Sequence, residues 1–274
     1  ISFLKKIVEF QILLYWFFIM KNIFREILHE DYIQEIVITR RIVEEQSEYQ
    51  FIQLLESKTF GKFLVLDHII QISEKDEFAY SEMLSHIPVL SIIHPKNILI
   101  IGGGDGAVAE EIVKHKDIVS IDLVEIDKRV IEISKKYLTS INRDVFHNKK
   151  LNVIINDASV FLNVNKKKYN VIIVDRPDDV GVATSLFSKK FYYNVSKSLD
   201  DEGVAIFQSG VVFFQKNTLQ ETISILRSVF KYSGVYITTV PSYVGGFMAI
   251  SWGSNGVDLE ERISFAKDNP LRKN

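Results

Sequence analysis

The sequence contains no cysteine among its 274 residues. It can therefore form no disulfide, and it has no thiolate to act as a nucleophile or a metal ligand. Its six histidines include no HxxxH pair, and we expect no metal site. An excess of positive charge is also missing: the chain has 33 lysines and arginines, 35 aspartates and glutamates, and a formal net charge of −2. This composition gives a nucleic-acid partner no support and favours small-molecule partners.

A run long enough to span a membrane is missing as well, although the N-terminus is apolar. The run FQILLYWFFIM covers residues 10–20, about half of the length that a membrane helix needs. It contains Gln11, and charged residues follow it without the small-residue cleavage site that ends a signal peptide. Two interpretations stay open: an N-terminal extension over residues 1–19, or a segment that lies on a membrane surface. We expect the extension, in a cytoplasmic protein.

Hydrophobic residues make up 47% of the chain, enough for the core of one large domain or of a domain with a smaller appendage. The first third contains short β-rich runs separated by polar residues or glycine. These runs are QEIVITRRIV (34–43), YQFIQLLES (49–57), FGKFLVLD (60–67) and HIIQI (68–72). We predict a small antiparallel β domain over residues 20–74.

The hydrophobic period becomes helical over residues 77–93, and strands then alternate with helices. The predicted strands are 97–101, 118–125, 150–156, 169–175 and 203–208, and the predicted helices are 107–115, 128–138, 158–163, 188–199 and 217–230. Near-continuous Ile, Val and Leu in these strands predict a parallel sheet covered on both faces. Runs at 234–240 and 247–253 would complete it as an antiparallel pair. The predicted class is α/β, with a Rossmann-like, methyltransferase-type doubly wound sheet over residues 75–274.

A glycine turn joins the first of these strands to its helix. Gly102-x-Gly104-x-x-Ala107 matches a dinucleotide-binding loop, although such turns also occur to let a helix pack against a strand. Glu125 follows about 20 residues later at the end of the next strand, where an acid can bind ribose hydroxyls. The alternative for Glu125 is a solvated acid at a strand end. We favour a nucleotide-type ligand at this turn.

Acidic residues follow most of the predicted parallel strands, at the edge of the sheet where ligands of such folds bind. They are Asp105, Glu125, Asp127, Asp157, Asp175, Asp178 and Asp179. Several also have a structural interpretation: Asp157 as a helix N-cap, Asp175 as a turn residue before Pro177, and Asp179 as a solvated loop charge. Together these acids predict a site for a cationic ligand.

The charge of Asp105 discriminates between nucleotide-type ligands. A pyrophosphate beside this carboxylate would be repelled by a few kcal/mol at intermediate dielectric, which argues against NAD and FAD. S-adenosylmethionine carries a sulfonium but also a carboxylate in its tail, which fits Asp105 less well. Decarboxylated S-adenosylmethionine ends in an ammonium instead, and it suits Asp105.

With these residues in view, the chain resembles the spermidine synthases, the polyamine aminopropyltransferases, from Phe24 to Gly253. The stretches that carry the resemblance are SEYQ (47–50), FGKFLVLDHIIQISEKDEFAYSEML (60–84), IIGGGDGAV (100–108), VEID (124–127), NDA (156–158), VDRPDDVGVATSLF (174–187), FYYNV (191–195), FQSG (207–210) and VPSYVGG (240–246). The resemblance implies a β domain before a Rossmann-like domain, a homodimer or homotetramer, and transfer of an aminopropyl group from decarboxylated S-adenosylmethionine, a co-substrate, to putrescine. It implies no resident cofactor and no metal.

The resemblance also implies the roles of particular residues. The donor would be bound by Gln50, Gln71, Gly102, Gly104, Asp105, Glu125, Asp157 and Ala158. The acceptor, a diamine or polyamine, would be bound by Tyr80, Asp175, Asp178, Gln208 and Tyr243. Asp175 is the expected proton acceptor, with Tyr80 and Asp178 beside it as catalytic residues. We define residues 175–186 as the gate loop, because the family uses this segment to cover the bound substrates.

The sequence departs from the family in the gate loop, where the usual pattern is Asp-Ser-Ser/Thr-Asp-Pro-x-Gly-Pro. Here Arg176 and Pro177 fill the middle, and Asp179 and Val182 replace the two prolines. A C-terminal Tyr-Tyr-Asn, His, Ala-Ala-Phe segment of the family also has no counterpart here. Cadaverine, agmatine or a longer polyamine therefore stay open as acceptors. A methyltransferase that uses S-adenosylmethionine and a non-catalytic polyamine or nucleoside binder are the alternatives from other classes.

Overall fold

The computed structural model describes residue 11 and residues 22–29, 31–178 and 181–265, and the chain forms two compact units, residues 1–75 and 76–274. The apolar run at residues 10–20, apart from Gln11, and Asp179 of the gate loop lie outside the described residues. Within the described part of the chain, no helix is both long and apolar enough to cross a membrane.

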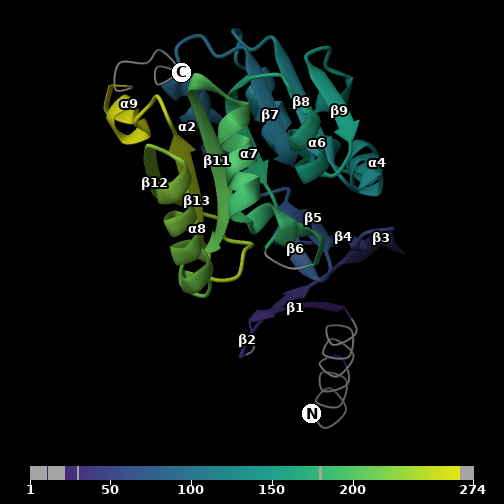
Figure 1. Cartoon of the computed structure of the whole chain (residues 1–274). Helices are drawn as coiled ribbons and strands as arrows, with labels where there is room; N and C mark the ends of the chain where they lie inside the picture. The colour runs from purple at the N-terminus through teal and green to yellow at the C-terminus, as the bar shows by residue number, and fades with distance from the viewer. Residues whose placement is uncertain (1–10, 12–21, 30, 179–180, 266–274) are drawn as a thin grey trace. The chain divides into compact units, whose positions relative to one another are not determined.

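The first unit consists of antiparallel strands, as the sequence predicts. β1 pairs with β2, and β3, β4, β5 and β6 form a second sheet in that order (Figure 1). The bounds are β1 (Ile23–His29), β2 (Tyr32–Val37), β3 (Arg40–Gln46), β4 (Phe51–Ser57), β5 (Gly61–Leu66) and β6 (Ile69–Ser73). The two sheets pack together through the rings of Phe24 and Phe63, whose centroids are 5.7 Å apart.

Two details of this unit differ from the sequence prediction. The strand β1 is not predicted, because its buried side chains include Glu26 while Ile27 is exposed, which inverts the expected apolar pattern. Glu26 is buried because its carboxylate accepts hydrogen bonds from the Ile70 amide at 3.1 Å and from Gln34 at 3.4 Å. The predicted run 34–43 also divides between β2 and β3: the Ile38 amide donates to Asn22 and the Thr39 amide to Glu56.

The second unit is an α/β sandwich around one sheet. The bounds of its strands are β7 (Asn97–Gly102), β8 (Ser120–Glu125), β9 (Leu151–Ile155), β10 (Tyr169–Asp175), β11 (Leu199–Val211), β12 (Tyr232–Thr239) and β13 (Phe247–Ser254). The bounds of its helices are α2 (Glu77–Ser91), α3 (Ala107–Val113), α4 (Lys128–Tyr137), α5 (Thr139–Asn142), η1 (Val145–His147), α6 (Ala158–Val164), η2 (Gly181–Phe187), α7 (Lys189–Ser198), α8 (Lys216–Val229) and α9 (Leu259–Phe265). Each predicted element of residues 77–253 is present, with ends that differ by a few residues.

The order of strands in this sheet is β12-β13-β11-β10-β7-β8-β9. The five strands from β11 to β9 are parallel, and β13 is antiparallel to both β11 and β12, which confirms the predicted C-terminal antiparallel pair. The chain runs outward from β7 to β9 and then returns to β10 on the other side of β7. The strand order therefore reverses between β7 and β10, the place where ligands bind in open α/β sheets.

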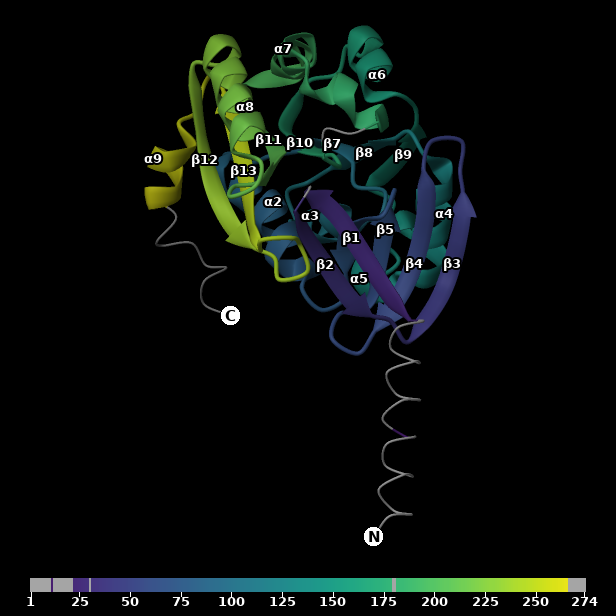
Figure 2. The ribbon, with the colours of Figure 1, turned by 90° about the horizontal axis from the view of Figure 1, so that it is seen from below.

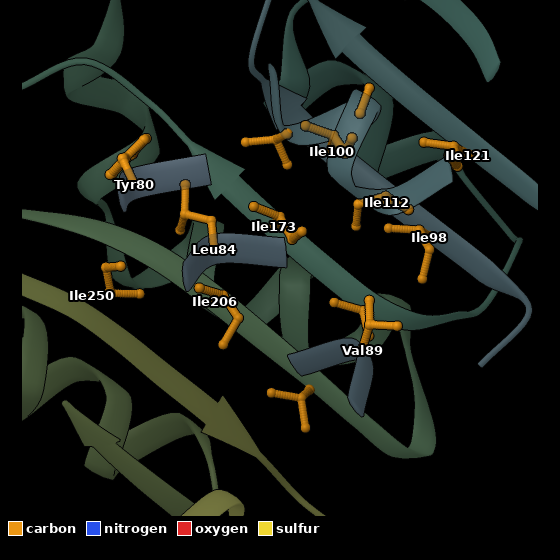
Figure 3. Close-up of a cluster of buried hydrophobic side chains, with 14 of the residues drawn as sticks. Tyr80, Leu84, Val89, Ile98, Ile100, Ile112, Ile121, Ile173, Ile206 and Ile250 are labelled. Carbon is orange, nitrogen blue, oxygen red and sulfur yellow. The ribbon is translucent and has the colours of Figure 1, made fainter. Parts of the chain in front are cut away.

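Alternate residues of the strands pack on opposite faces of the sheet. On one face Ile98 and Ile100 of β7 pack with Leu84 of α2 and Ile112 of α3, as Figure 3 shows. On the other face Leu99 and Ile101 pack with residues of α6, α7 and α8. Figure 2 shows α6, α7 and α8 on one side of the sheet and α2 and α3 on the other. Burial on both faces explains the near-continuous apolar strands of the sequence.

Candidate active site

The register of the parallel strands brings the predicted site residues to one edge of the sheet. Asp175 at the end of β10 lies opposite Gly102 at the end of β7. Phe207 of β11 pairs with Val174, so Gln208 lies beside Asp175. Val124 of β8 pairs with Ile101, so Glu125 lies on the other side of Gly102. Residues far apart in the sequence thus meet where the strand order reverses.

The glycine turn allows β10 to approach the end of β7. The backbone φ of Gly102 is +78°, and a Cβ there would lie 2.0 Å from the carbonyl oxygen of Asp175. The Gly103 amide donates to that same carbonyl at 3.2 Å. A Cβ on Gly104 would lie 2.9 Å from Oε2 of Glu125, so this glycine leaves room for the Glu125 carboxylate.

Asp105 fills the place in the turn that an anionic ligand would otherwise take. Its Oδ1 accepts a hydrogen bond from the Ala107 amide at 2.8 Å, at the start of α3. Its backbone carbonyl accepts from Nδ2 of the fully buried Asn142 at 3.2 Å. Burial raises the pKa of Asp105, although the Ala107 amide opposes this by stabilising the carboxylate. The protein's own carboxylate therefore accepts from the first amide of α3, and a negative ligand group is disfavoured there.

Asp175 is the central carboxylate of the site. Its Oδ1 accepts a hydrogen bond from the hydroxyl of Tyr80 at 2.8 Å, across 95 residues of sequence. Burial and the negative charges of Asp105 and Glu125 raise the pKa of Asp175, and the Tyr80 bond lowers it in part. The pKa of Tyr80 is itself raised by burial and by Asp175, so this hydroxyl stays a donor. The Tyr243 ring lies edge-on to the Tyr80 ring at 5.8 Å.

Glu125 is a second buried carboxylate of the site, with 9% of its surface exposed. Its Oε1 accepts from the Asp127 amide at 2.9 Å. Burial, then the charge of Asp127 and that of Asp105, raise its pKa to about 7. The alternative interpretation of Glu125, a solvated acid at the strand end, is therefore wrong, because the carboxylate is enclosed. Asp127 caps α4 by accepting from the Arg129 amide at 2.9 Å.

Asp157 caps α6, because its Oδ1 accepts from the Val160 amide at 2.9 Å. This contact confirms the N-cap interpretation of Asp157. The preceding residue Asn156 donates its amide to the Glu125 carbonyl at 3.1 Å, so the start of α6 lies beside the Glu125 strand end. The role of Asp157 and the buried Ala158 in binding a donor stays a prediction.

Asp178 and Gln208, two residues predicted to bind the acceptor, contact each other. Nε2 of Gln208 lies 3.5 Å from Oδ1 of Asp178. Gln208 is 5% exposed, and among the described residues its Oε1 is buried without a hydrogen-bond partner. A buried acceptor of this kind is stabilised by a donor from a ligand. Sequence analysis missed Gln215, whose Nε2 donates to the same Oδ1 of Asp178 at 2.8 Å; a glutamine at the start of an amphipathic helix carries no motif.

Asp76 is another residue that the sequence analysis missed. Its carboxylate is 6% exposed and accepts from the amide of Ser242 at 2.6 Å and from its hydroxyl at 3.1 Å. These bonds attach the segment that carries Tyr243 to the start of α2, the helix that carries Tyr80. The pair of tyrosines is therefore held by contacts that no local pattern indicates.

Arg176, a departure from the family pattern, is a buried side chain with 3% of its surface exposed. Its guanidinium donates to the carbonyls of Gln208 and Leu186 and to the hydroxyl of Tyr192, the last at 2.7 Å. It also stacks on Phe187, with the guanidinium carbon 3.5 Å from the ring centroid. These contacts attach the residue after Asp175 to the far end of the gate loop.

Gln50 and Gln71 belong to the first unit, and their part in donor binding stays a prediction. Gln50 is buried, and its amide donates to the hydroxyl of Ser47 at 3.0 Å. The Nε2 of Gln71 donates to the Ile69 carbonyl at 3.1 Å. Across residues 22–29, 31–178 and 181–265, the structure contains no group of three or more histidines and carboxylates placed to hold a metal ion.

Comparison with protein-family models matches both units. Residues 77–261 match the model described as the spermine/spermidine synthase domain. Residues 22–74 match the model described as the spermidine synthase tetramerisation domain.

Individual relatives agree with these models. The chain is 38% identical over 230 residues to the polyamine aminopropyltransferase of Ruegeria sp. (strain TM1040), covering 84% of this chain and 81% of that protein. It is 40% identical over 221 residues to the polyamine aminopropyltransferase of Methanocaldococcus jannaschii, covering 79% and 75%. A crystal structure of a spermidine synthase in complex with the transition state analogue AdoDATO matches with a TM-score of 0.86 and 29% identity, over 90% of this chain and 86% of that one.

The buried Glu125 predicts an unusual dependence of stability on pH. Its folded-state pKa, about 7, lies above its ordinary value of 4.5, so its contribution is present below pH 4.5 and is lost as the pH rises through 7. The difference corresponds to about 3 kcal/mol. We expect Glu125→Gln to raise the Tm of the ligand-free protein relative to wild type more at pH 8 than at pH 5, measured by calorimetry.

The half-exposed Glu132 on α4 provides the control, because hydrogen bonds from Arg129 and Lys128 lower the pKa of its carboxylate. Glu132→Gln should therefore change the Tm by the same amount at pH 5 and at pH 8. A Tm difference between wild type and Glu125→Gln that is the same at pH 5 and pH 8 would contradict the raised pKa of Glu125.

Proposed function

Because the chain belongs to the spermine/spermidine synthase family, we propose that it transfers the aminopropyl group of decarboxylated S-adenosylmethionine to putrescine. The products are spermidine and methylthioadenosine. The observation that carries this proposal is Asp175, a half-buried carboxylate that accepts from Tyr80 and neighbours Asp105 and Glu125. Such a cluster is strained by its own negative charge, and a ligand with several positive charges relieves it.

The donor fits the side of the site formed by the glycine turn and Glu125. Glu125 binds the ribose hydroxyls in this proposal, and the start of α6 at Asp157 and Ala158 binds the adenine edge. The ammonium at the end of the aminopropyl group lies between Asp105 and Asp175. Intact S-adenosylmethionine would place a carboxylate near Asp105, where the start of α3 already holds a negative group. This contrast supports the decarboxylated donor over the intact one.

The acceptor fits the side formed by Asp178, Gln208 and Tyr243. One nitrogen of the diamine lies beside Tyr80 and Asp175, and the distal ammonium lies beside Asp178. The unpartnered Oε1 of Gln208 supports an N–H donor at this place. The rings of Tyr80 and Tyr243 contribute apolar contact for the methylene chain.

The reaction is a single displacement. The lone pair of a neutral primary amine forms a C–N bond to the carbon next to the sulfonium, and the C–S bond breaks with its electrons moving to sulfur. A free alkylamine has a pKa of about 10.4 by analogy with lysine, so it must first lose a proton. Asp175 accepts this proton, and its raised pKa makes it a better base than an ordinary carboxylate. Tyr80 orients the nitrogen, and alignment contributes part of the rate.

We also propose the roles of the two parts of the chain. Residues 75–274 form the catalytic domain, residues 20–74 form the domain through which copies of the chain assemble, and residues 1–19 are an extension. The match of residues 22–74 to a tetramerisation domain supports assembly into a homodimer or homotetramer. Sedimentation equilibrium of the full chain tests this assignment.

The activity is tested by mass spectrometry of the products from decarboxylated S-adenosylmethionine with putrescine, cadaverine, agmatine or spermidine. We expect methylthioadenosine and an acceptor that is heavier by one aminopropyl group, with the highest kcat/KM for putrescine. Adenosylhomocysteine from intact S-adenosylmethionine would indicate a methyltransferase. Saturable binding of methylthioadenosine without any product would indicate a binding protein and contradict the proposal.

The proton acceptor is tested by Asp175→Asn. The amide can still accept from the Tyr80 hydroxyl but cannot take a proton from the amine, so we expect kcat to fall by about 100-fold or more. Methylthioadenosine should bind with nearly unchanged Kd in calorimetry, because it carries no group that needs the charge. Turnover close to that of wild type would show that another group accepts the proton.

The charge of Asp105 should affect the pH dependence of kcat/KM, through the pKa of Asp175. Because the negative charge of Asp105 raises the pKa of Asp175, Asp105→Asn removes this repulsion and lowers that pKa. We expect the acidic limb of kcat/KM for the acceptor to move to lower pH, while kcat/KM at its maximum falls. An unmoved limb in the variant, measured from pH 5 to 9, would mean that Asp175 does not control it.

A further inference from the structure

Gln215 stands immediately before α8 and links the end of β11 to the gate loop. Its Oε1 accepts a hydrogen bond from the Val211 amide at 2.6 Å. Its Nε2 donates to Oδ1 of Asp178 at 2.8 Å. The backbone amide of Gln215 also donates to the Val211 carbonyl at 2.8 Å, which holds the residue against the strand end.

Chemistry determines which way the Gln215 amide faces. A backbone N–H can only donate, so the atom of Gln215 next to Val211 must be its oxygen. The NH₂ group then faces Asp178, where a carboxylate can only accept. Among the residues that the structure describes, the bonds to Asp178 both reach Oδ1, from Gln215 and from Gln208, and none reaches Oδ2. Within the described residues, one oxygen of this carboxylate is thus occupied by protein amides and the other accepts no hydrogen bond.

Gly210 provides the space for this arrangement. A Cβ at this position would lie 2.4 Å from Oε1 of Gln215, and the backbone φ is +81°. The glycine of the FQSG stretch therefore permits both the irregular backbone near the end of β11, where the pairing with β13 shifts in register, and the position of the Gln215 amide. The resemblance to the family included Gly210 only as part of a stretch, without a physical role.

We propose that Gln215 is a positioning residue that orients Asp178 for the distal ammonium of the acceptor, and thereby sets the affinity for the amine. This inference rests on the proposed function, because it assigns Asp178 to the acceptor. Without Gln215 the carboxylate can rotate and its Oδ1 competes for the same ammonium. The expected consequence is a higher KM for the acceptor with little change in kcat, since the reacting nitrogen lies at Asp175.

Two substitutions distinguish an orienting role of Gln215 from a purely structural role. Gln215→Glu keeps an oxygen for the Val211 amide but replaces the N–H at Asp178 with a second carboxylate oxygen, which repels Asp178. The structural contact with Val211 therefore remains, and the orienting contact with Asp178 is lost. Gln215→Leu removes both contacts. We expect both variants to raise the KM for putrescine by about tenfold or more, the scale of a hydrogen bond to a charged group. We expect kcat to change by less than about threefold and the Kd of methylthioadenosine to stay constant.

Gln220→Leu is the matched control, because Gln220 is an exposed glutamine on the same helix. It should leave the KM, kcat and Tm unchanged. If Gln215→Glu has the KM of wild type, the contact with Asp178 has no orienting role and the proposal is overturned. It is equally overturned if kcat falls as far as kcat/KM, since Gln215 would then act on the chemical step.

If the wild-type protein transfers no aminopropyl group, the proposed function is refuted, and the role of Gln215 is then tested by binding alone. Putrescine is then titrated into wild type and Gln215→Glu, each saturated with methylthioadenosine, by calorimetry. Weaker binding to the variant supports the orienting role in a binding protein. Equal binding, or no binding to either protein, overturns it.

Discussion

The parallel pairing of β7 with β10 places Gly102 opposite Asp175, and the arrangement of the site follows from this register. The two strands are neighbours in space but lie on opposite sides of the reversal in strand order. Their ends therefore diverge, and the residues that follow them surround a common point. Gly102 is required there because the carbonyl of Asp175 occupies the position of a side chain. The hydrogen bond from the Gly103 amide to the Asp175 carbonyl then joins the glycine turn to the end of β10.

Three carboxylates lie close together at this point, those of Asp105, Asp175 and Glu125. Their proximity lowers the free energy of unfolding of the ligand-free protein. Glu125 is buried and the two aspartates are half-buried, and each carboxylate has a raised pKa because the others lie near it or because water is excluded. The same electrostatics favours ligands with several positive charges, since each carboxylate that ionises on binding gains an attractive partner. The repulsion between the unliganded carboxylates and the attraction of a bound cation therefore have one physical source, the negative charge of the site.

Neutral groups give this acidic site its shape. Tyr80 donates to Asp175, and Gln208 and Gln215 donate to Asp178. The amide and hydroxyl of Ser242 donate to Asp76, which attaches the segment of Tyr243 to the start of α2. Arg176 is positively charged, but its guanidinium donates to two carbonyls and a tyrosine and stacks on Phe187. It anchors the gate loop in place of the serine that the family commonly has here. Amides and hydroxyls orient the carboxylates without neutralising them.

Sequence patterns predicted the second unit well because its strands are buried on both faces. Continuous Ile and Val runs, interrupted by glycine or acids at strand ends, are the direct result of that burial, and β10 has the predicted bounds of 169–175. The first unit was harder, because its packing overrides the local pattern. The strand β1 buries Glu26 and exposes Ile27, which becomes favourable only when the Ile70 amide lies opposite the carboxylate.

The acids at the strand ends, the glycine turn and the resemblance to the family are properties of the chain itself, since strand ends and turn residues are encoded locally. The partners of those residues are decided by the tertiary structure. The role of Asp157 as the N-cap of α6 could be predicted from the sequence, because the capping hydrogen bond joins residues that are only three positions apart. The bonds of Gln215 to Asp178 and of Asp76 to Ser242 span 37 and 166 residues, and they form only because the sheet brings those segments together.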